Sequence, residues 1–124
     1  MIQFSILPSA ARSATFNSQK IENLGDHRGI KLYLDITAVA GGSPTMDIKL
    51  QSFDKLSEKW FDIPAAAFAQ KTATGQSTLT IYPSVTDTAN ESVADLLPDT
   101  WRIVATLGGT TPVFTFSLGG CLMD

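Results

Sequence analysis

Residues 29–39 read GIKLYLDITAV, and apolar and polar side chains alternate along this stretch. A period of two residues is that of a β-strand with one face in the core and the other in water. The apolar positions that fall on one face are Ile30, Leu32, Leu34, Ile36 and Ala38. The stretch therefore predicts a half-buried strand.

The same alternation recurs further along the chain. It is found in residues 46–51, 77–82, 101–107 and 112–118. Turn-forming residues separate these segments, and we expect turns at AGGSP (residues 40–44) and at GGTT (residues 108–111). The polar hexapeptide at residues 54–59 predicts a loop that joins residues 46–51 to residues 60–63 in a β-hairpin.

These segments predict an all-β fold, an antiparallel β-sandwich or barrel of seven to nine short strands. At most one short helix is expected, near Glu91 to Leu97, where Ser92 resembles a weak N-cap. The chain of 124 residues fits a single β domain over residues 1–124. The expected core consists of Leu32, Leu34, Ile36, Ile48, Leu50, Ile81, Ile103, Phe114 and Phe116.

Charge and hydropathy argue against several classes of function. The formal net charge is -3 and the nine Lys and Arg residues are scattered, so we expect no nucleic-acid partner. No run approaches the ~20 apolar residues of a membrane span, so no membrane partner is expected. Residues 1–8 lack the regions of a signal peptide. The single cysteine allows no internal disulfide. Together with the lack of signal-peptide regions, this predicts a protein of the cytoplasm.

Candidate catalytic and metal-binding residues are few. His27 could act as a base oriented by Asp26, but an exposed loop histidine is the favoured interpretation, because adjacent side chains of an extended segment point apart. Cys121 has no activating base nearby in the sequence. Thr86 to Glu91 offers oxygen ligands for calcium but lacks the spacing of a known loop. We therefore expect no enzyme, no cofactor and no metal.

Four aromatic residues could form a platform on which a sugar ring stacks. They are Tyr33, Trp60, Tyr82 and Trp101. The alternative, which we favour, places both tryptophans in the core and both tyrosines in cross-strand packing.

Three segments carry a resemblance to a known family: residues 28–39, residues 79–83 and residues 97–106, the last with the Pro-Asp-Thr-Trp-Arg run at 98–102. Together they resemble small virion proteins of tailed phages, some of which are head decoration or cement proteins. The resemblance spans most of the chain from Arg12 onward. It implies a structural protein on the capsid surface, assembled in the host cytoplasm, that binds the major capsid protein and forms a homo-oligomer there.

A cement protein needs contact arms, and residues 1–13 and 119–124 are the candidates. The contact residues expected on them are Ile2, Phe4, Ile6, Leu122 and Met123. Two other functions stay open, a carbohydrate-binding or adhesin-like β-sandwich module and a tail or neck component of a virion.

Overall fold

The computed structural model describes residues 2–124, and they form eight strands and no helix. The strands are β1 (Ile2–Arg12), β2 (Phe16–Asn17), β3 (Ile21–Glu22), β4 (Gly29–Asp54), β5 (Lys59–Ala67), β6 (Gly75–Ile81), β7 (Ser92–Val93) and β8 (Thr100–Met123). All belong to one open sheet with the order β1-β8-β4-β6-β7, in which β2 and β3 also pair with β8, and β5 pairs with β4. The expected all-β fold is confirmed.

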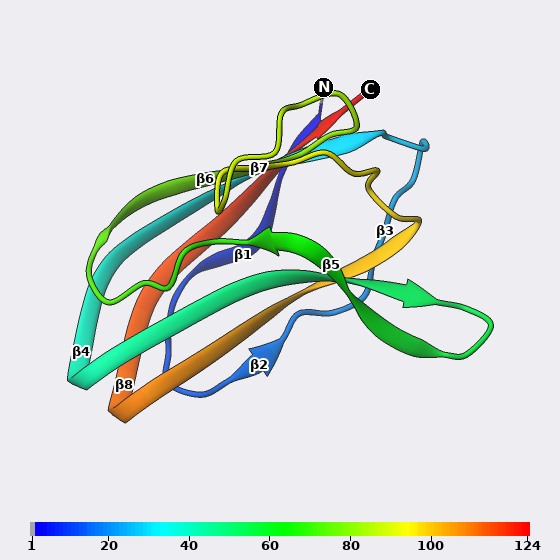
Figure 1. Cartoon of the computed structure of the whole chain (residues 1–124). Helices are drawn as coiled ribbons and strands as arrows, with labels where there is room; N and C mark the ends of the chain where they lie inside the picture. Colours follow the sequence, from blue (N-terminus) through cyan, green and yellow to red (C-terminus); the bar gives the residue numbers. More distant parts are fainter. Residues whose placement is uncertain (1) are drawn as a thin grey trace.

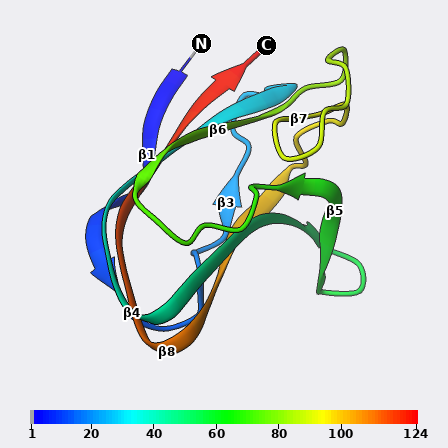
Figure 2. The same cartoon turned by 60° about the vertical axis from the view of Figure 1, so that its left-hand side comes forward.

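Two long antiparallel strands form the frame of this sheet (Figure 1). β4 has 26 residues and β8 has 24, so these two of the eight strands are longer than the short strands that the sequence predicted. Both bend sharply at the same place, so that the two halves of the sheet face each other (Figure 2). One sheet thereby takes the two-layered form that a sandwich builds from two sheets.

The bend lies where the sequence predicted two chain-reversing turns, and that expectation is wrong. Residues 40–44 stay within β4 and residues 108–111 stay within β8, while the register between the strands shifts beside Gly42. Gly41 (φ 117°) and Gly109 (φ 101°) adopt backbone conformations that residues with a side chain rarely adopt. A Cβ on Gly109 would lie 2.5 Å from the carbonyl oxygen of Ser43. Glycines and bulges therefore bend the paired strands instead of ending them.

No helix forms near residues 91–97, which agrees with the expectation of at most one short helix. Ser92 and Val93 form strand β7, which pairs in parallel with Thr80 and Ile81 of β6. This parallel pair is the exception in a sheet whose other pairs are antiparallel. Val93 is buried in the core, so tertiary packing outweighs the weak capping signal of Ser92.

The core lies between the two halves of the bent sheet. All nine residues expected in it are buried, as is Trp101, which is fully enclosed. Ala38 is exposed although it shares the alternation of residues 30–36, because the register shifts between Ile36 and Ala38. The predicted hairpin is confirmed: Gln51 pairs with Asp62 in the β4–β5 ladder.

None of residues 2–124 lies in a helix that is long and apolar enough to cross a membrane.

Candidate functional site

His27 is buried, at 9% exposure, so the expectation of an exposed loop histidine is wrong. Its Nδ1 lies 2.7 Å from Oδ1 of Asp124, which follows β8. Its backbone N–H donates to the Asn23 side-chain oxygen (3.1 Å), and the Asn23 amide donates to its carbonyl oxygen (2.8 Å). Asp26 is not the partner of the ring. The histidine thus fastens its loop to the end of β8, and a partnered buried side chain of this kind is typical of structural roles.

The other candidates for chemistry have structural surroundings too. Cys121 is buried within β8, between β1 and β4. In the segment from Thr86 to Glu91, Asp87 accepts a hydrogen bond from the backbone N–H of Ala94 (2.7 Å). Among residues 2–124, no group of three or more His, Cys, Asp and Glu side chains could hold a metal ion.

The two candidate contact arms are strands of the sheet. Ile2 to Arg12 form β1, which pairs with the second half of β8. The end of β8 lies between β1 and β4, where Leu122 pairs with Ile2 on one side and Ile30 on the other. Residues 119–123 are therefore built into the sheet instead of forming a free arm, and Leu122 and Met123 are half-buried. Ile2 is exposed and Phe4 and Ile6 are half-buried. That these residues contact a partner stays a prediction.

The aromatic side chains do not form a shared exposed platform. Trp101 belongs to the core, as favoured, but Trp60 is half-buried outside it. Tyr33 is 40% exposed on the outer face of β4, and the Tyr82 hydroxyl donates to the backbone oxygen of Asp124 (2.7 Å). Of the four aromatic residues considered for a sugar-stacking platform, Tyr33 is the one with a largely exposed ring.

A different element stands out from the body of the protein: the β4–β5 hairpin, which projects beyond the bent sheet (Figure 1). Next to the pair that closes its tip loop, Phe53 and Trp60 form a cross-strand pair with ring centroids 4.9 Å apart. The Lys20 ammonium lies 4.3 Å from the centre of the Phe53 ring, and the Arg102 guanidinium lies 4.2 Å from that of Trp60. Cation–π contacts on both rings therefore stabilise the hairpin near its tip loop against Lys20 and β8.

Hydrogen bonds to Asp54 order the loop at the tip. Its carboxylate accepts from the backbone N–H of Leu56 (3.1 Å) and from the backbone N–H and hydroxyl of Ser57 (3.3 and 2.8 Å). Its carbonyl oxygen accepts from the Glu58 N–H (2.8 Å). The bonds from the Ser57 hydroxyl and the Leu56 N–H lower the pKa of the Asp54 carboxyl. The ionised carboxylate therefore holds the loop above the ordinary pKa of aspartate, and this hold is lost as the pH falls through the lowered pKa.

A second polar network fixes the outer face of the hairpin. The Asp62 carboxylate accepts from the side chains of Gln51 (2.8 Å) and Lys49 (3.0 Å), which lower its pKa. The Gln51 side-chain oxygen in turn accepts from Arg102 (2.9 Å). The orientation of the hairpin is thus tied to β8.

The ordered hairpin presents apolar side chains to solvent. Leu56 is 95% exposed at the tip. Phe61 is 54% exposed and lies on the same face of the strands as buried Leu50 and Ile63, but beyond the end of the core. Nothing in the sequence singles out either residue, because Leu56 stands in a polar hexapeptide and Phe61 continues a normal alternation. The exposure of both side chains depends on how far the hairpin extends beyond the core, and the sequence pattern does not show this.

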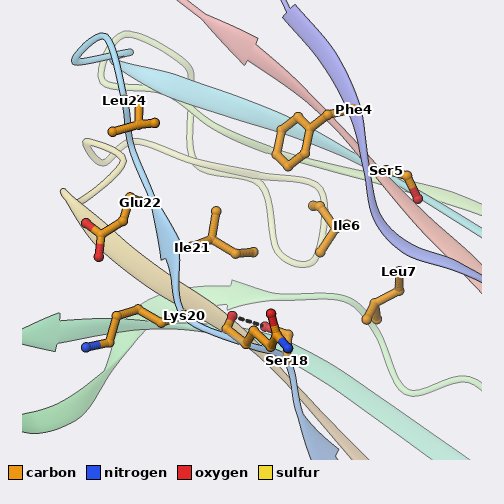
Figure 3. A pocket seen from close by; sticks show the side chains of 10 residues that line it. Phe4, Ser5, Ile6, Leu7, Ser18, Lys20, Ile21, Glu22 and Leu24 are labelled. Carbon is orange, nitrogen blue, oxygen red and sulfur yellow. Dashed lines mark hydrogen bonds between the residues drawn. The ribbon is translucent and has the colours of Figure 1, made fainter.

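A groove of about 550 Å³ lies at another edge, between β1 and the segment around β3 (Figure 3). Phe4 and Ile6 point from β1 toward Ile21 and Leu24, whereas Ser5 points away. The groove is where the inner face of the bent sheet opens to solvent.

Comparisons of the chain with protein-family models, with curated proteins and with solved structures find no match.

Proposed function

We propose that this protein is a structural, non-enzymatic component of a tailed-phage virion that attaches to the assembled capsid through its β4–β5 hairpin. The observation that carries the docking proposal is an ordered hairpin that projects from the body with Leu56 almost fully exposed. The capsid as partner is supported by the resemblance of residues 28–39, 79–83 and 97–106 to small virion proteins.

The hairpin suits docking because its order exists before binding. A side chain on a loop held by several hydrogen bonds loses little conformational freedom when a partner covers it. Apolar residues that fill a partner's pocket supply most of the energy of an interface, and polar residues around them exclude water. Lys55, Glu58 and Lys59 surround the tip and provide such a rim.

The test is co-sedimentation of the purified protein with expanded heads built from the major capsid protein of the genome that encodes this chain. Leu56→Asp and Phe61→Ser should each weaken binding about 30-fold, the effect of losing one hot-spot residue of about 2 kcal/mol. Leu96→Asp is the matched control, because Leu96 is 57% exposed on a different segment. It should bind as the unaltered protein does, and melting curves should agree for all four proteins.

Failure of the unaltered protein to sediment with heads would reject the capsid as partner. Full binding by Leu56→Asp and Phe61→Ser would reject the hairpin as the docking element.

A further inference from the structure

The outer edge of β1 is unpaired in the part of the chain that the structure describes. β1 stands at the end of the sheet order and pairs only with β8. Residues 2–11 of this strand carry no charged side chain. Long uncharged edges of this kind are ready templates for another strand, and natural proteins usually block them with charges or bulges.

Only the second half of β1 is blocked in this way. The Arg12 guanidinium donates to the carbonyl oxygens of Pro8 (2.7 Å), Ala10 (3.3 Å) and, across the ladder, Phe116 (2.7 Å). The first half carries neither a charge nor a proline before residue 8, and its register with β8 is regular from Ile2 to Ser5. The open template is therefore residues 2–6, of which Ile6 lies at the first register shift, between Ser5 and Leu7.

This template is complementary to itself. In an antiparallel pair centred on Phe4, Phe4 faces its own copy, Ile2 faces Ile6 of the second copy, and Gln3 faces Ser5. Apolar side chains then meet on the inner face and polar side chains on the outer face, which is the arrangement that stabilises cross-strand pairs. No like charges meet, because the template has none.

The groove beside β1 gives such a pair more to bury than backbone alone. A second strand that pairs with the edge of β1 would place the apolar side chains of its inner face over the mouth of the groove. Ile21 and Leu24 line the opposite side of that groove. Leu24 in this groove is 80% exposed, and Ile2, which by strand alternation shares the face of Phe4, is 53% exposed. Pairing would therefore cover Leu24, the most exposed of the apolar side chains that line the groove, and would satisfy the free backbone N–H and C=O groups of β1.

We propose that β1 is a self-association edge, through which two copies of this chain form a two-fold symmetric dimer with a sheet continuous across both. A second copy is the occupant that the residues favour, since one two-fold axis pairs the β1 edges of both copies at once. This dimer does not depend on the proposed capsid partner, because the hairpin and the β1 edge share no residue.

Sedimentation velocity over a range of concentrations tests the dimer. Ile2→Asp and Leu24→Asp, which place a charge against the apolar mouth, should each raise the dimer dissociation constant at least about tenfold. Leu56→Asp is the matched control, and it should dimerise like the unaltered protein even though it loses capsid docking. A second readout uses Gln3→Cys and Ser5→Cys, each in a Cys121→Ser background. A disulfide-linked dimer should form when the two are mixed under oxidation, and much less with either alone.

A chain that stays monomeric at hundreds of micromolar would overturn the proposal. So would dimers that persist unchanged in both Ile2→Asp and Leu24→Asp, or a failure of the mixed cysteine variants to cross-link. Loss of dimerisation in Leu56→Asp alone would place the interface at the hairpin and overturn it as well.

Discussion

Leu34 and Leu56 are the same residue type at opposite extremes of exposure, 2% and 95%. Leu34→Ala should lower the free energy of unfolding by about 2–5 kcal/mol, because it leaves a cavity in an enclosed core. Leu56→Ala should change it by less than about 0.5 kcal/mol, the usual size of a surface substitution. Urea denaturation of the two variants and the unaltered protein measures both values. Similar losses in the two variants would contradict the burial that the structure assigns to these side chains.

Residue-scale burial was the part of this structure most open to prediction. A strand that faces water on one side must alternate, so the pattern of residues 29–39 alone placed Leu32, Leu34 and Ile36 correctly in the core. The pattern failed at Ala38, where a register shift reverses the faces. It also failed at His27, whose partner Asp124 is 97 positions away in the sequence. Sequence periodicity carries no signal of either.

At the scale of the element, residues 119–123 show how a local pattern can mislead. An apolar tail after a glycine pair suggested a free contact arm, yet these residues form the end of β8 and lie between β1 and β4. Gly120 leaves room for its neighbours: a Cβ there would lie 3.0 Å from the Phe4 ring and 3.1 Å from the Ile30 and Ile6 side chains. Gly120 is therefore a requirement of close packing between three strands.

Truncation after Leu118 should accordingly abolish the fold, not only a contact. It removes the pairing partners of Ile2 to Ser5 in β1 and of Gly29 to Tyr33 in β4, which exposes two strands to solvent.

Deletion of Asp124 alone is the matched control. It removes the partner of His27 and of Tyr82, and each lost hydrogen bond should cost about 0.5–1.5 kcal/mol. Amide NMR spectra distinguish the outcomes: collapsed dispersion is expected for the truncation and native dispersion for the deletion. Native dispersion in the truncated chain would instead support the hypothesis that residues 119–124 form a free contact arm.

At the scale of the whole molecule, the shape depends on one corner. β4 and β8 cross it together, and the core residues on both sides of it form one cluster. Neither half of the sheet can bury its inner face without the other, so the two halves should be stable only together. The sequence signalled this corner with glycine pairs in both segments, but glycine pairs suit a hairpin turn as well as a bend. A hairpin turn forms when the two flanking strands pair with each other, and a bend forms when both pair with the same neighbouring strand. Tertiary contacts decide between these two pairings.

Gly109→Ala should therefore destabilise the entire molecule in a single cooperative transition. The positive φ of Gly109 alone should cost alanine about 1–2 kcal/mol, and the approach of a Cβ to the Ser43 carbonyl oxygen at 2.5 Å adds to it. Gly119→Ala is the matched control, because Gly119 has no positive φ and a Cβ there would meet only the Phe4 carbonyl oxygen, at 3.7 Å. Thermal unfolding should be followed by tryptophan fluorescence and by hydrogen exchange. The fluorescence reports on Trp60 and Trp101, which lie in the half of the sheet that contains the start of β8, and the exchange of residues 114–118 reports on the other half. For Gly109→Ala both probes should shift together to lower temperature, and for Gly119→Ala neither should shift appreciably. A shift confined to one half would mean that the corner is a hinge between independent units, and an unshifted Gly109→Ala would mean that the bend does not need glycine there.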